Sequence, residues 1–273
     1  MAMALEMKID KESKWFALVK TLLIIIVSLV LFVAVWWFLA LTLDFTALPT
    51  PAETFDALVD LFANGVSSGS SSTPFSTYIL SSLETFVKGA IAAFVIAVPL
   101  GLLLGYIKTL RTFLTPWIEV IRPIAPIAWA PIFIISMGYE LGPPLVVFVG
   151  MFFPILTNVM FGVTKIDDGL FDAAKTLGAN KAQIFMKVIF PSSVPFMLSG
   201  LKIALGVGWM CIVAAELYAP PLGGIGTFIN TMSTQGAWPE VYAGLIIIAA
   251  LGILTTGVTE YAHKIVSKHM GVE

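Results

Sequence analysis

The fold of this chain is decided by residues 165–191, which read Lys-Ile-Asp-Asp-Gly-Leu-Phe-Asp-Ala-Ala-Lys-Thr-Leu-Gly-Ala-Asn-Lys-Ala-Gln-Ile-Phe-Met-Lys-Val-Ile-Phe-Pro. This polar stretch lies between two runs of uncharged residues, 141–164 and 188–201. Of the 273 residues in the chain, 58% are hydrophobic and only 12% are charged. A soluble domain carries about twice that charged share. The composition therefore predicts an integral membrane protein in which residues 165–191 form a connection outside the bilayer.

Outward from this connection, uncharged runs recur along the chain, and each is near the length of about 20 residues that a bilayer requires. The six runs are Thr21–Leu43, Gly89–Ile107, Pro123–Tyr139, Leu141–Thr164, Val188–Ala215 and Val241–Thr259. Only the fifth is interrupted, by Lys202. The first is too long for a signal-peptide core and lacks a cleavage site, so we interpret it as an uncleaved span. We expect an all-α integral membrane protein with six transmembrane helices.

Lysine and arginine residues predict the orientation, since they are enriched on the cytoplasmic side of membrane proteins. They precede the first span, separate the second from the third, recur in residues 165–190 and follow the sixth span. Residues 44–78 and 217–240 contain acidic residues but neither lysine nor arginine. We therefore expect both termini and the 165–190 loop in the cytoplasm.

The expected organisation has five parts: a cytoplasmic N-terminal arm, a first transmembrane helix, an external segment, a core of five transmembrane helices with the 165–190 loop, and a cytoplasmic tail. Their bounds are 1–20, 21–43, 44–78, 79–266 and 267–273. In the external segment, Thr50 and Glu53 have the spacing of a capping box, which predicts a short amphipathic helix. The Ser/Gly-rich residues 66–73 predict a flexible link.

The 165–190 loop itself has the pattern of two short helices. Asp167 or Asp168 can cap the first, its apolar residues recur at helical spacing, and Gly178 ends it. A second amphipathic piece follows, and Pro191 opens the next span. No basic patch suited to nucleic acid is present. The residues alone leave two interpretations open: a helix resting on lipid headgroups, or a helix that docks on a partner protein.

The spacing of this loop resembles that of the membrane subunits of ABC importers. Their pattern is Glu-Ala-Ala, three residues, Gly, nine residues, Ile, one residue, Leu-Pro. In this chain the matching positions are Asp172, Ala173, Ala174, Gly178, Val188, Phe190 and Pro191. The departures are Asp for Glu, Val for Ile and Phe for Leu. In that family the loop is the coupling helix that docks on a cytoplasmic ATPase, so the resemblance implies that Asp172, Ala173, Ala174, Gly178 and Pro191 form the ATPase contact.

A second match narrows the resemblance to one branch of the ABC importer membrane subunits. Residues 122–131, Arg-Pro-Ile-Ala-Pro-Ile-Ala-Trp-Ala-Pro, are similar to the Arg-Pro-Ile-Pro-Pro-Ile-Ala-Trp-x-Pro motif of nitrate, sulfonate, taurine and bicarbonate importers. Residues 153–158, 174–179 and 213–216 are also similar to that branch, and the resemblance spans about 81–262. It implies the type I importer permease fold and a small anion or organic solute as substrate. Permeases for thiamine precursors share much of the pattern and are an alternative.

The resemblance also implies the partners. Two permease subunits, expected to be a homodimer, pair with two cytoplasmic ATP-binding subunits, and an external solute-binding protein delivers the substrate in a prokaryotic cell membrane. Residues 178–181 and 223–226 contain glycines but lack the phosphate-binding-loop pattern. We therefore expect no enzymatic activity and no cofactor in this chain, with ATP and Mg bound by the partner. An ion-gradient-driven secondary transporter is disfavoured, because it would be expected to have paired charges at mid-membrane.

Candidates for the translocation pathway are Trp129, Phe133, Trp209, Met210 and Glu216. An acid within a membrane segment is a functional candidate, although at the end of a span it can simply be solvated. Aromatic and methionine side chains in such segments more often serve packing. No metal site is expected, because the two histidines and one cysteine are too few and too scattered in the sequence.

Overall fold

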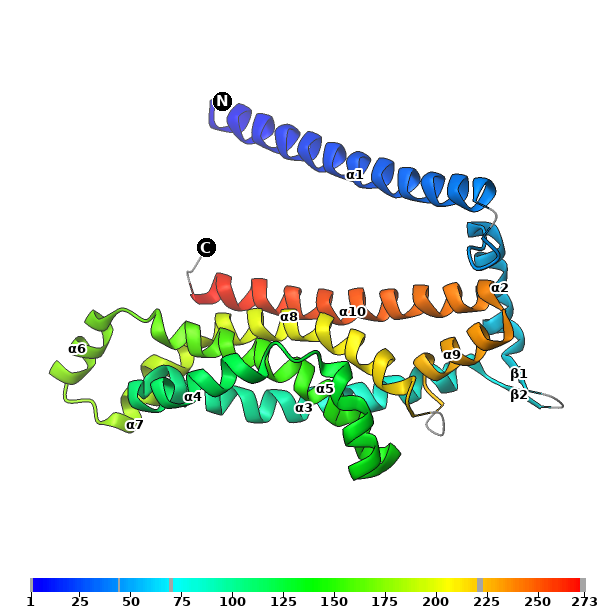
Figure 1. Ribbon diagram of the computed structural model, residues 1–273. Helices are drawn as coiled ribbons and strands as arrows, with labels where there is room; N and C mark the ends of the chain where they lie inside the picture. Colours follow the sequence, from blue (N-terminus) through cyan, green and yellow to red (C-terminus); the bar gives the residue numbers. More distant parts are fainter. Residues whose placement is uncertain (1, 44, 69–70, 220–222, 271–273) are drawn as a thin grey trace.

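A computed structural model describes residues 2–43, 45–68, 71–219 and 223–270, and it is almost entirely helical (Figure 1). Its elements in chain order are α1 (Ala2–Thr42), α2 (Pro51–Asn64), β1 (Val66–Ser68), β2 (Ser71–Thr73), α3 (Phe75–Tyr106), α4 (Lys108–Ile121), the 3₁₀ helix η1 (Pro126–Trp129), α5 (Ala130–Thr164), α6 (Asp168–Thr176), α7 (Lys181–Ile184), the π-helical turn η2 (Phe185–Ile189), α8 (Phe190–Glu216), α9 (Ile225–Gln235) and α10 (Trp238–Met270).

The core of the protein is a bundle of α3, α5 and α8, with α10 packed along α8. Its fully buried side chains include Ala97 on α3, Met151 and Ile155 on α5, and Ile212 on α8. Small residues allow the helices to approach closely. A Cβ atom on Gly101 would lie 2.8 Å from Cβ of Val159. Any larger residue at this position would push α3 away from α5.

Five helical segments in the described residues are long and apolar enough to cross a membrane. They are Val19–Thr42, Phe75–Tyr106, Pro126–Thr164, Lys181–Glu216 and Trp238–Ile265. The sequence predicted six, and the difference lies in its third and fourth spans. These share the single run Pro126–Thr164, which is broken at Gly138 (φ 77°, ψ 179°). The expected third span is not one regular helix, because prolines at 123, 126 and 131 interrupt its hydrogen bonds.

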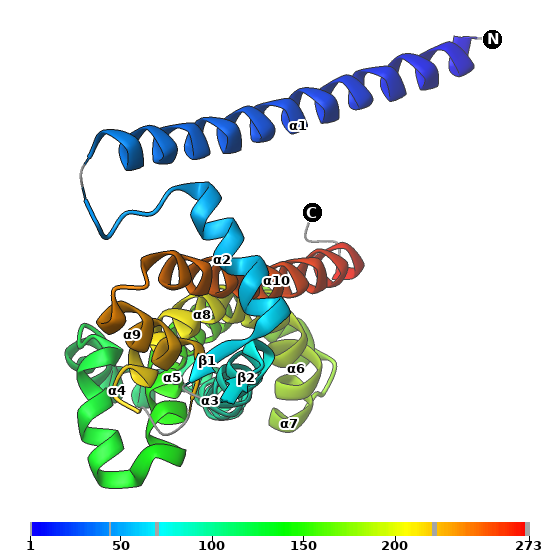
Figure 2. The same ribbon diagram turned by 90° about the vertical axis from the view of Figure 1, so that its right-hand side faces the viewer.

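Helix α1 combines the predicted N-terminal arm and first span in one element, and it stands away from the bundle (Figures 1 and 2). None of the most apolar window within Val19–Thr42 is buried. Trp36 makes the main described contacts, since its Nε1 donates to the carbonyl oxygen of Pro49 at 3.0 Å and its ring stacks on Tyr242 at 5.8 Å.

The segment between α1 and α3 contains the predicted capping box. The side chain of Thr50 accepts from the Glu53 N–H, and a Glu53 carboxylate oxygen accepts from the Thr50 N–H at 2.8 Å. Helix α2 follows, as expected. Most of the predicted flexible link at residues 66–73 is instead regular, because β1 and β2 pair as antiparallel strands with Val66 opposite Thr73, while residues 69 and 70 lie outside the described residues. Val66 is buried with Leu61 and Phe75 in a second apolar cluster, which anchors β1 to α2 and to the start of α3.

Candidate functional site

Residues 165–190 form a helix–turn–helix at one end of the bundle, as the sequence predicted. Asp167 caps α6 by accepting a hydrogen bond from the Gly169 N–H at 2.8 Å. Gly178, at φ 77°, provides the left-handed turn after the helix, where a side chain would be strained. Asn180 and Gln183 then form a second capping box that starts α7. Both helices of the loop are therefore fixed by local hydrogen bonds.

Helix α6 has one face on the protein and one face free. Phe171 and Ala174 pack against the core cluster that includes the buried Ile184 of α7. On the other side Leu170 is 51% exposed and Leu177 is 87% exposed, with the exposed Ala173 between them. We call Leu170, Ala173 and Leu177 the outer face of α6. An exposed apolar stripe on a helix held in place from behind is typical of a docking surface.

The polar side chains at the predicted ATPase contact lie at the protein surface. Asp172 pairs with Lys175 on the same helix, with 3.0 Å between Oδ1 and Nζ, and both side chains are more than half exposed. Such a pair contributes little to stability, so both charges are available to a partner. Pro191 lies in the first turn of α8, the position that its missing N–H favours.

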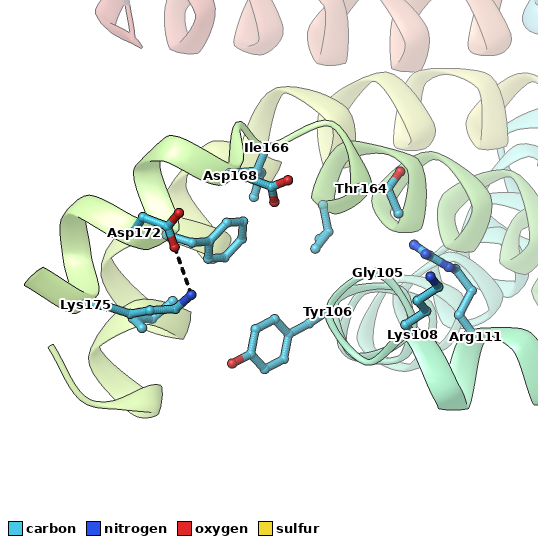
Figure 3. A pocket seen from close by; sticks show the side chains of 12 residues that line it. Gly105, Tyr106, Lys108, Arg111, Thr164, Ile166, Asp168, Asp172 and Lys175 are labelled. Carbon is cyan, nitrogen blue, oxygen red and sulfur yellow. Dashed lines mark hydrogen bonds and ion pairs between the residues drawn. The ribbon is translucent and has the colours of Figure 1, made fainter.

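A cavity of about 590 Å³ separates the loop from the junction of α3 and α4 (Figure 3). One wall belongs to α6 and carries Asp168, Asp172 and Lys175. The opposite wall, at the start of α4, carries Lys108 and Arg111 (Figure 3). The remaining lining residues are Gly105, Tyr106, Val163, Thr164, Ile166, Phe171 and Ile184.

At the other end of α8, Glu216 is buried, with 1% of its surface exposed. Ser82 of α3 donates its hydroxyl to the carboxylate at 2.7 and 2.9 Å, and the Gly226 N–H donates to Oε2 at 2.8 Å. The Ser82 oxygen in turn accepts from the Ile225 N–H at 2.8 Å. We call Glu216, Ser82, Ile225 and Gly226 the Glu216 clamp, because they join α3, α8 and the start of α9.

The other pathway candidates fall in three different environments. Trp129 and Phe133 stack with ring centroids 5.7 Å apart and are half-buried where η1 joins α5. Trp209 is 3% exposed and stacks on Phe86 at 4.5 Å, within the core. Its neighbour Met210 points away from the core and is 73% exposed. The structure thus brings Trp129 and Phe133 together and separates them from Glu216 in the clamp.

Several residues that build these sites were not identified from the sequence. Ser82 gave no signal, because a lone serine in a helix predicts no particular partner. Gly224 also gave none, although a Cβ there would lie 2.1 Å from the Glu216 carboxylate. Lys202 and Glu260 form an ion pair at 3.0 Å between α8 and α10. Lys202 interrupts the fifth apolar run and Glu260 directly follows the sixth. Charges at such positions could have indicated that the two residues pair.

Residues 97–272 match the family model described as the binding-protein-dependent transport system inner membrane component. The chain belongs to this family. It is therefore a permease subunit of an ABC transporter in the inner membrane, and the resemblance noted in the sequence is confirmed.

Relatives support the same assignment over most of the permease. A putative ABC transporter permease of Methanocaldococcus jannaschii is 34% identical over 224 residues, which cover 81% of this chain and 82% of the relative. The taurine transport system permease protein TauC of Escherichia coli is 31% identical and covers 90% and 89%. The bicarbonate transport system permease protein CmpB of Synechococcus elongatus is 30% identical and covers 70% and 69%.

Among solved structures, a chain of the MetNI methionine ABC transporter in inward-facing conformations aligns with a TM-score of 0.58 at 19% identity. The alignment covers 69% of this permease and 94% of that chain. At this identity the likeness concerns the fold, and it agrees with the predicted type I importer permease fold.

Proposed function

We propose that this permease forms the translocation pathway for a small anion or organic solute of the nitrate, sulfonate or taurine, and bicarbonate class, and that the 165–190 loop couples it to a cytoplasmic ATPase. The observation that carries the coupling role is the outer face of α6. Leu170 and Leu177 remain mostly exposed although the helix behind them is capped and packed. A surface that is apolar, rigid and uncovered is suited to a protein partner.

Charge favours a protein partner over a lipid surface for α6. Helices that lie on membranes are usually rich in lysine and arginine on their polar face. Helix α6 has nine residues and carries Asp168, Asp172 and one lysine, Lys175. Its two carboxylates would be repelled by anionic headgroups. Of the two interpretations that the sequence left open, the charge of α6 therefore favours docking on a partner protein over resting on lipid headgroups.

The finer arrangement is part of the proposal. In this arrangement the chain has six spans with both termini in the cytoplasm, and the residues before and after the break at Gly138 belong to different spans. A second permease subunit, two ATP-binding subunits and an external solute-binding protein complete the transporter. ATP binding would close the ATPase dimer, move the α6 helices and favour the outward-open state.

The coupling role is tested by Leu177→Asp in the permease purified with its ATPase and reconstituted in liposomes. We expect the ATPase to dissociate and ATP-dependent uptake to be lost, because a charge is buried without a partner at the contact. Leu177→Met is the matched control and should retain both. Normal assembly and uptake with Leu177→Asp would contradict the docking role.

The substrate class is tested by uptake of labelled taurine, bicarbonate and nitrate into the same liposomes in the presence of the cognate binding protein. Uptake of one of these that needs ATP supports the proposal. Uptake of a thiamine precursor instead would favour the alternative permease. Uptake that continues without the ATPase and collapses with an ion gradient would contradict an ATP-driven importer.

A further inference from the structure

Beyond the coupling role, we infer that the cavity between α6 and the α3–α4 junction is a binding site for a phosphate-bearing anion. The cavity encloses about 590 Å³, which is within the range of ligand sites in proteins, roughly 300–1,000 Å³. We call it the junction cavity, and its cationic wall is formed by Lys108 and Arg111.

The carboxylates that line the cavity, those of Asp168 and Asp172, belong to α6 on the facing wall and not to the cationic wall. Among the side chains that the structure describes, Lys108 and Arg111 form no ion pair, unlike Lys175 on the facing wall, which pairs with Asp172. The two residues of the cationic wall are three positions apart on α4, so their side chains lie on the same face of that helix and their like charges repel. An anion between them would remove that repulsion and accept charge-assisted hydrogen bonds from both.

Other groups around the cavity favour a compact, multiply charged ligand. Lys175 reaches the cavity from α6, and its exposed pair with Asp172 is weak enough to be exchanged. The Tyr106 side chain starts at the end of α3, and its hydroxyl points away from Lys108 and Arg111 towards the loop side of the cavity in Figure 3. Asp168 also faces the cavity and opposes an anion. The ligand is therefore expected to lie towards Lys108 and Arg111, and Asp168 is expected to weaken its binding.

The position of the cavity fits two sources of the same chemistry. It lies where α3 ends at Tyr106 and α5 ends at Thr164, which is the headgroup depth of a bilayer if these helices span it. Basic pockets at such sites bind the headgroups of acidic lipids. A soluble phosphate compound can also enter from the water side. A bound anion would link α6 to the core, so its occupancy would stiffen the coupling loop.

The test is direct binding to the full-length permease without the ATPase, so its result does not depend on the coupling proposal. The unfolding midpoint is measured in phosphatidylcholine nanodiscs, in the same nanodiscs with added pyrophosphate, and in nanodiscs containing phosphatidylglycerol. We expect at least one anion to raise the midpoint of the wild type. A rise with phosphatidylglycerol alone identifies a lipid, and a rise with pyrophosphate identifies a soluble phosphate.

In the double variant Lys108→Gln/Arg111→Gln the rise should be lost, and in Arg111→Gln alone the apparent affinity should fall roughly tenfold or more. The matched control is Lys264→Gln/Lys268→Gln, which removes two positive charges from α10 and should retain the rise. Asp168→Asn should strengthen binding. The inference is overturned if no anion shifts the wild type, if the control variant loses the shift equally, or if Asp168→Asn lowers the midpoint without anion and abolishes the shift.

Discussion

The Glu216 clamp and the coupling loop lie at opposite ends of the helical run Lys181–Glu216, and they are built in opposite ways. In the clamp, a buried carboxylate takes its hydrogen bonds from α3 and from the start of α9. In the loop, the polar side chains bond within their own helix and stay exposed. One end of α8 is thus locked into the protein by tertiary contacts, whereas the other presents a locally stabilised helix to the outside.

This difference indicates where the permease can move. A segment whose polar groups bond only within itself can shift as a unit without leaving buried groups unpaired, whereas one held by buried hydrogen bonds to other helices cannot. The loop is therefore suited to transmit a displacement into the N-terminal end of α8, and the clamp is suited to hold the far end of that helix against α3.

The largest loss of stability is expected for Gly226→Ala in the clamp. A Cβ there would lie 2.5 Å from the carbonyl oxygen of Val213, which belongs to the backbone and cannot rotate away. We expect a loss towards the upper end of the roughly 1–3 kcal/mol seen for overpacking, measured as the free energy of unfolding in detergent. Gly206→Ala is the control, because nothing lies within 4 Å of its added Cβ. An equal loss in both variants would contradict the close fit.

A smaller loss is expected for Ser82→Ala. This change removes the donor to Glu216 and the acceptor of the Ile225 N–H, which leaves buried polar groups unpaired. We expect a loss of about 2 kcal/mol in the same unfolding measurement. Ser76→Ala on the exposed start of α3 should change stability by less than about 0.5 kcal/mol. If Ser82→Ala behaves like Ser76→Ala, the clamp does not hold the helices together.

In the coupling loop, Lys175→Ala should have little effect on folding. The ion pair that it breaks is exposed, so we expect a loss below about 1 kcal/mol that disappears at high salt. Lys202→Ala serves as a comparison, because its pair with Glu260 joins α8 to α10 and is less exposed. A larger loss for Lys175 than for Lys202 would mean that the loop is held more tightly than its contacts indicate.

The smallest effect concerns the capping box of α2, outside the spans. The hydrogen bond from the Thr50 N–H lowers the pKa of Glu53 below its ordinary value of 4.5. A lowered pKa means that the unfolded form binds the proton more readily, so the cap stabilises α2 fully above pH 4.5 and loses that effect as the pH falls below it. We expect the protection factors of the amides in the first turn of α2, which are corrected for the slower intrinsic exchange at low pH, to fall there. Glu53→Gln should show no such step.

The elements of the fold could largely be predicted from the sequence, because their signals are local. The capping box at Thr50, the cap at Asp167 and the end of α6 at Gly178 were all predicted, and each depends on residues within a few positions. The third and fourth spans were predicted as separate helices, but the structure has one run that breaks at Gly138. The prediction placed their boundary at Glu140, because a charged residue marks the end of an apolar run. The distribution of charge carries no information on backbone dihedral angles, so it could not show the break at Gly138.

The sites could be predicted only in part. The motif located the coupling loop, yet it did not show that Leu177 faces outward while Ala174 faces the core. Glu216 was a candidate because an acid among apolar residues is unusual, but its partner Ser82 lies 134 positions away. No periodicity connects residues at such a separation.

The sequence alone established that this protein is a helical membrane protein, which family it belongs to and that residues 165–190 contain a helix–turn–helix. These follow from hydropathy, from the distribution of lysine and arginine, and from local motifs that act within one or two helical turns. Only the tertiary structure decided which face of α6 is free, how Glu216 is satisfied and that a cavity lies beside Lys108 and Arg111. The physical reason is that burial and hydrogen-bond partners depend on how α3, α5, α8 and α10 pack, and packing joins residues that are distant in the sequence.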